Sequence, residues 1–174
     1  MSKLLKFHAF ILILVLGGFQ LFDLSADAQE NPSPTESPRC AEVTEQVSSL
    51  INNYTEVKDS YLLRFRTLSR DVSAFSVSVE SEGYDTTQLR ESLITMNDYI
   101  DQFELYMKRL LTSLNNAADA ACSDDRNSFD SSMIEVNSFI IAARQQALTI
   151  RNFSLQTVKS DLIDLANSKT ESNG

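Results

Sequence analysis

The chain has 174 residues, a formal net charge of −9, one histidine and no tryptophan. An acidic chain has no electrostatic attraction to nucleic acid or anionic lipid, which argues against partners of either kind. The only histidine, His8, lies in an N-terminal segment that resembles a cleaved signal, so the processed chain would lack the base that Ser-His-Asp and Cys-His catalysis require.

The N-terminal region has the three-part layout of a signal peptide. Two lysines precede a mostly apolar run over residues 7–22, and a small-x-small cleavage site ends at Ala28. The apolar run is short for a membrane span of about 20 residues, and two consecutive glycines interrupt it. We therefore expect residues 1–28 to be removed on export to a secreted, periplasmic or cell-surface location. Retention of the segment as a membrane anchor is the alternative.

Residues 29–37 form a polar, proline-containing spacer that cannot build a core, and we expect it to be disordered. At its end, Ser37 is a good N-cap, and the proline that follows suits the first helical position, where its missing N–H costs nothing. Apolar residues then recur every three or four positions, which predicts a helix over residues 38–82. Gly83 is expected to end this helix because glycine accepts a left-handed backbone.

A second helix is predicted over residues 86–122. Asp85 and Gln88 form a variant of the capping box that marks its start. Its apolar positions alternate intervals of four and three, which is the heptad pattern of coiled coils. These positions are Leu89, Leu93, Met96, Ile100, Phe103, Met107, Leu110, Leu114, Ala117 and Ala121. Ile94 and Leu111 widen the apolar stripe, which suits a helix that contacts two neighbours.

A third helix is predicted over residues 126–166, although the spacing of its apolar positions drifts after Phe153. Residues 167–174 are expected to form a disordered tail. Short connections favour an antiparallel arrangement of consecutive helices. The predicted fold class is therefore all-α, an elongated antiparallel up-down-up three-helix bundle with coiled-coil-like packing over residues 38–166.

The two cysteines, Cys40 and Cys122, are candidates for a disulfide, with free thiols and intermolecular links as the alternatives. In an antiparallel hairpin, residues equally far from the turn face each other, and the midpoint of this pair falls at residue 81, beside the predicted turn. An oxidising compartment would let one such bridge persist. We expect a structural role for it, because the cysteines lack the Cys-x-x-Cys spacing of redox motifs.

The layout of Cys40 at a helix start, a Gly-Tyr-Asp turn at Gly83 and an Ala-Cys pair ending at Cys122 resembles a family of proteins. These are uncharacterised exported three-helix proteins of candidate phyla radiation bacteria. The resemblance covers about residues 39–165. It implies a bacterial secreted or cell-envelope protein, and it implies no activity.

Carboxylates are the remaining side chains with potential for chemistry. Asp98, Asp101 and Glu104 recur at helical spacing, but they fall between apolar positions, which favours a solvated helix face over a catalytic pair. Glycine-rich phosphate loops are absent from the sequence. We therefore expect no catalytic residues, no cofactor and no metal ligands.

These observations predict a non-catalytic exported module for binding or for cell-envelope structure, with an envelope or extracellular protein as its partner. Self-association through leftover apolar positions such as Ile94, Leu111 and Ile141 remains open. The alternative is a protein whose amphipathic helices bind lipid or a membrane surface. Net acidity and the disulfide argue against that alternative, so membrane contact would otherwise come only through an uncleaved signal segment. An enzyme that uses carboxylates alone ranks third.

Overall fold

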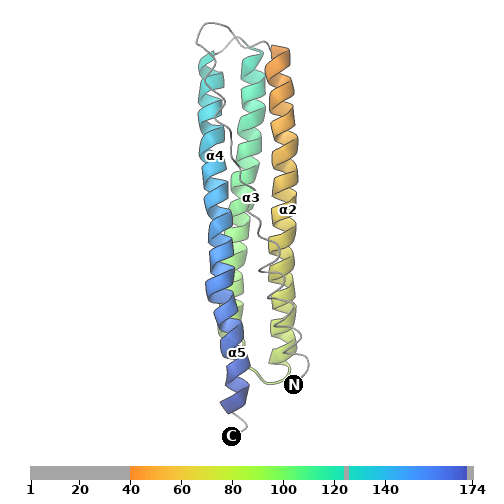
Figure 1. The fold of residues 1–174 in the computed structure, drawn as a ribbon, viewed down its shortest axis with the longest axis vertical. Coiled ribbons are helices and arrows are strands. Elements are labelled where there is room, and N and C mark those ends of the chain that lie inside the picture. Colours follow the sequence, from red (N-terminus) through yellow and green to blue (C-terminus); the bar gives the residue numbers. More distant parts are fainter. Residues whose placement is uncertain (1–39, 124–125, 172–174) are drawn as a thin grey trace. The chain divides into compact units, whose positions relative to one another are not determined.

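The structure, a computed structural model, describes residues 40–123 and 126–171, and all regular structure within them is helical (Figure 1). Helix α2 spans Cys40–Glu80, α3 spans Thr87–Ala121 and α4 spans Arg126–Phe153. A short π-helical turn, η1 (Ser154–Val158), then leads into α5 (Lys159–Glu171). The predicted signal peptide and spacer lie outside the described residues, as does the predicted N-cap Ser37.

Helix α3 is the central element of this helical unit, because it packs against both α2 and α4, whereas α2 and α4 make at most slight backbone contact with each other (Figure 1). All the core positions predicted for α3 are buried, and Met96, Leu110 and Leu114 have no exposed surface. The prediction that Ile94 widens this buried stripe is wrong, since 63 % of its side chain is exposed. A regular heptad line is enough to bury α3 between two neighbours.

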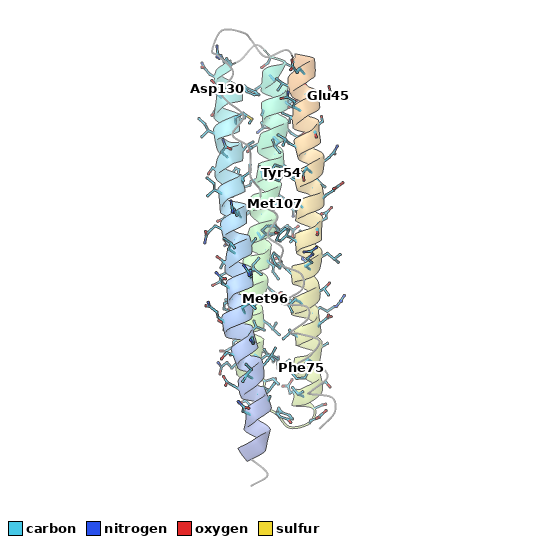
Figure 2. The ribbon with its side chains drawn as sticks, in the orientation of Figure 1. Glu45, Tyr54, Phe75, Met96, Met107 and Asp130 are labelled. Carbon is cyan, nitrogen blue, oxygen red and sulfur yellow. A yellow bond between two sulfur atoms is a disulfide. The ribbon has the colours of Figure 1, made fainter. Side chains whose placement is uncertain are left out.

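Helix α2 packs on α3 through an aromatic cluster near the middle of both helices. The ring of Phe65 lies 5.6 Å from that of Tyr61 and 5.7 Å from that of Phe103 on α3, centroid to centroid. Both contacts are edge-to-face, a geometry worth about 0.5–1.5 kcal/mol per pair beyond the area buried. Buried Tyr54 continues this side of α2 towards the helix start, and burial raises the pKa of its hydroxyl (Figure 2).

Specific side-chain pairs define which parts of α2 and α3 lie together. The first residue of α2, Cys40, is bonded to Cys122 just after α3. Farther along, the hydroxyl of Ser69 donates to the side-chain oxygen of Asn97 at 2.7 Å. At the other end of α2, Arg90 of α3 forms an ion pair of 3.2 Å with Glu80. The start of α2 therefore lies beside the end of α3, and the end of α2 beside the start of α3.

The third helical region is interrupted where the sequence pattern drifts. On α4, Val136, Ala143 and Ile150 are buried at intervals of seven residues. The next buried apolar residue is Val158, the last residue of η1, and Leu162 and Leu165 follow on α5. A π turn holds one residue more than an α-helical turn, and this extra residue accounts for the drift after Phe153. The prediction that helical structure ends at residue 166 is wrong, because α5 continues to Glu171.

Candidate functional site

The disulfide predicted from the sequence is present in the structure and joins Cys40 to Cys122, with Cα atoms 4.7 Å apart. The hydroxyl of Thr44, one turn along α2, lies 3.5 Å from the sulfur of Cys122. A bonded sulfur carries no proton, so the threonine is the donor in this weak contact. Both sulfurs are part of the bridge, so neither cysteine is a free thiol.

The turn between α2 and α3 contains two of the predicted residues, Gly83 and Asp85. Gly83 has a φ of +90°. Its N–H donates to the carbonyl of Glu80 at 3.0 Å, and the N–H of Tyr84 donates to the carbonyl of Val79 at 3.2 Å. This pair of hydrogen bonds is the Schellman motif, which satisfies the last carbonyl groups of a helix.

Asp85 accepts a hydrogen bond of 3.0 Å from the backbone N–H of Thr87, the first residue of α3. This bond lowers the pKa of the Asp85 carboxyl. The predicted capping box of Asp85 and Gln88 is wrong, because the N-cap residue of α3 is Thr86 and the side chain of Gln88 does not turn back towards the start of the helix. The amide of Gln88 instead donates to the carboxylate of Asp161 on α5, at 2.8 Å.

Several polar groups in the described part of the chain are buried among the helices. Asp161 is only 5 % exposed, and its second carboxylate oxygen has no hydrogen-bond partner among the described residues. In η1, the buried hydroxyl of Ser154 donates to the carbonyl of Ile150 at 2.8 Å and lies 3.7 Å from the sulfur of Met96. These contacts fix how η1 and α5 sit against α3.

Two of the three carboxylates of α3 that recur at helical spacing, Asp101 and Glu104, form ion pairs on the surface. Glu104 pairs with Lys108 on its own helix, 2.8 Å away, and with Arg66 of α2. The hydrogen bond from Lys108, together with the charge of Arg66, lowers the pKa of Glu104. A general acid needs a raised pKa, so this environment suits an ion pair and does not suit acid catalysis.

Two contacts between α3 and α4 involve residues that the apolar pattern did not single out. The buried hydroxyl of Ser113 donates to the carboxylate of Glu135 at 3.1 Å, and the amide of Gln146 donates to the backbone carbonyl of Tyr99 at 3.1 Å. Ser113 immediately precedes the core position Leu114, and that neighbourhood was the only sequence signal that could have marked it. Both contacts tie α4 to α3.

Large apolar side chains are also exposed on each α-helix. They are Leu50, Leu63, Val77, Ile94, Leu105, Ile134, Ile141 and Ile163. On α2 and α3, charged residues flank several of them along the helix, such as Asp59 and Arg66 around Leu63. These exposed groups are the features of the described surface that favour contact with another molecule.

Within residues 40–123 and 126–171, no group of three or more His, Cys, Asp or Glu side chains is arranged to hold a metal ion. None of the helices in the same ranges is long and apolar enough to cross a membrane. Compared with protein-family models, curated proteins and solved structures, the chain matches none of them.

Proposed function

We propose that the protein is a non-catalytic exported module for binding or for cell-envelope structure. The single observation that supports this most directly is the Cys40–Cys122 disulfide, which bonds the start of α2 to the end of α3. Such a bridge is compatible with an oxidising compartment outside the cytoplasm. It also restrains α2 from separating from α3, as a long-lived binding surface requires.

The proposed scaffold is an up-down-up bundle with coiled-coil-like packing. The disulfide at one end of α2 and the Glu80–Arg90 ion pair at the other support opposite directions for α2 and α3. The heptad spacing of the buried residues of α3 supports coiled-coil-like packing. A scaffold of this kind presents long helix faces, and its partner would be an envelope or extracellular protein.

The experiment uses the chain from Gln29 onward, purified without reductant and immobilised. It is exposed to cell-envelope proteins and glycans of the source organism. We expect saturable binding of one component, reproduced with that component in pure form. As a control, Cys40→Ser combined with Cys122→Ser keeps the surface chemistry but releases the bridge, and it should weaken binding. Turnover of a small substrate by the purified protein would overturn the proposal.

A second candidate is binding to a lipid surface, which the exposed apolar side chains on every α-helix favour. The net charge of −9 opposes attraction to anionic lipid. Flotation with neutral and anionic vesicles, with and without reductant, separates the two candidates. Protein that floats only after reduction would support helices that open onto lipid, and protein that stays unbound in every condition would eliminate this candidate.

A further inference from the structure

One face of α4 carries a second line of regularly spaced residues, directed away from the core. Its positions follow intervals of four and three, and we call it the outer line of α4. Its members are Asp130, Ile134, Asn137, Ile141, Arg144 and Leu148. Leu148 is half-buried and the others are exposed, with 70 % of both isoleucines accessible. At 100° per residue, the centre of this line lies about 140° around the helix from the buried positions Val136, Ala143 and Ile150.

The outer line differs in charge from the other exposed apolar positions. Between Ser131 and Ala143 the only charged residue is Glu135, and its carboxylate accepts the hydrogen bond from Ser113 of α3. By contrast, Leu63 on α2 is also 70 % exposed but lies between Asp59 and Arg66. The middle of the outer line is therefore an uncharged strip on an acidic protein, and it is apolar except for Asn137.

The two ends of the strip carry opposite charges. Asp130 lies near the start of α4 (Figure 2), and Arg144 lies on the same face almost four turns later. Among the described residues, neither Asp130 nor Arg144 forms an ion pair with a neighbouring helix. A surface with a neutral middle and opposite charges at its ends is complementary to a copy of itself turned end to end.

We propose that a second copy of the chain docks on the outer line, with the two α4 helices running in opposite directions. A two-fold axis near Asn137 brings Ile134 of each copy to Ile141 of the other and places Asp130 near Arg144. Two chains of charge −9 repel each other, so self-association requires a contact that excludes like charges, and this strip provides one. The outer line is about 27 Å long, which predicts a small interface and a reversible dimer.

Sedimentation velocity of the chain from Gln29, over a range of protein concentrations, tests the proposal. We expect a monomer–dimer equilibrium in the wild-type protein. Ile141→Glu should raise the dimer dissociation constant at least about tenfold, because it buries a charge in the apolar strip. The matched control is Leu63→Glu, at a position of equal exposure on α2, which should leave the constant unchanged. A wild-type protein that stays monomeric, or equal effects of both substitutions, would overturn the proposal.

Charge reversal tests the orientation separately. Asp130→Lys places two cations together in the proposed dimer, and Arg144→Glu places two anions together, so each alone should weaken the dimer. The double variant restores opposite charges and should return the dissociation constant to within about twofold of wild type. Failure of that rescue would exclude the opposed arrangement. Capture of monomeric wild type by vesicles, lost on Ile141→Glu, would assign the strip to lipid and also overturn the proposal. None of these results bears on whether the protein is catalytic.

Discussion

At the scale of single residues, position 83 requires a left-handed backbone, which glycine adopts more readily than any other residue. Its φ of +90° is strained for any residue with a Cβ atom, although no atom lies within 4 Å of where that Cβ would be. We expect Gly83→Ala to lower the free energy of unfolding by about 1 kcal/mol, purely through this backbone strain. Urea denaturation of the oxidised protein measures the change.

Gly83→Asn is the control for this prediction, because asparagine tolerates a left-handed backbone better than alanine does. It should recover part of the lost stability although its side chain is larger. If asparagine destabilises as much as alanine or more, steric crowding and not backbone strain is responsible.

The carboxyl of Glu104 is expected to link stability to pH. Its pKa is lower in the folded protein than in the unfolded chain, so its ion pairs stabilise the fold above the ordinary carboxyl pKa. That contribution is lost as the pH falls through the folded pKa. Glu104→Gln should cost about 0.5–1 kcal/mol at neutral pH, as expected for a partly exposed ion pair, and the cost should shrink on acidification.

Urea denaturation at several pH values checks this, with Asp98→Asn as the control on an exposed position of the same helix. The asparagine variant should follow the wild-type pH profile. A cost of Glu104→Gln that stays constant from neutral to acidic pH would show that packing, and not charge, is the cause.

At the scale of helices, the accuracy of the sequence predictions follows the number of neighbours. The heptad positions of α3 are all buried because α3 packs on both sides. On α2, which makes more than slight contact only with α3 among the described helices, Leu50 follows the three-or-four apolar spacing but is 38 % exposed, while Ser69 and Ser76 are buried without an apolar signal. A helix with one neighbour needs only a narrow stripe, so apolar spacing overstates how much of it is buried.

The candidate site was predictable where it depends on position along the chain, and not where it depends on tertiary contacts. The pairing of Cys40 with Cys122 follows from their equal distances from the turn. The partner of Gln88 does not, because Asp161 is 73 residues away and reaches it only through the packing of α5. Asp85 does accept a local hydrogen bond, from Thr87, which needs no tertiary contact, but the N-cap residue of α3 is Thr86.

The π turn η1 gives a prediction at this scale. Deleting Gln156, an exposed residue of η1, removes the extra residue and should convert the turn to α-helix. The buried line that runs through Ile150 and Ser154 would then continue beyond the turn with regular intervals of three and four. We expect the free energy of unfolding to change by less than about 1 kcal/mol, because the lost turn is replaced by α-helical hydrogen bonds.

The matched control deletes Gln145, an exposed residue within α4. Residue 145 lies in regular α-helix and not in a π turn, so deleting it shifts the register of the helix. The shift rotates Ile150, which has no exposed surface, away from the core. A loss of more than about 2 kcal/mol is expected, comparable to truncation of a buried aliphatic side chain. Equal losses for the two deletions would mean that η1 is required for stability as it stands.

At the scale of the whole helical unit, α2 depends on α3 alone, because it makes at most slight backbone contact with α4. The turn at Gly83 holds one end of α2, and the disulfide holds the other, across a sequence separation of 82 residues. Replacing both cysteines with serine should lower the free energy of unfolding by about 4–5 kcal/mol if loop closure in the unfolded chain is the whole effect. Denaturation with and without reductant measures this, and the serine variant itself should not respond to reductant.

Hydrogen exchange separates two origins of the stability that is lost when the disulfide is removed. If the disulfide acts only on the unfolded chain, removing it should speed exchange of the slowest amides throughout the three long helices. If it also anchors α2 to α3 in the folded state, its removal should increase the exchange rates of amides around Val47 much more than those around Val79, where the turn still holds the helix. We expect the second pattern, because α3 is the only helix of the described residues that makes more than slight contact with α2. Uniform acceleration along α2 would contradict it and would confine the role of the disulfide to the unfolded state.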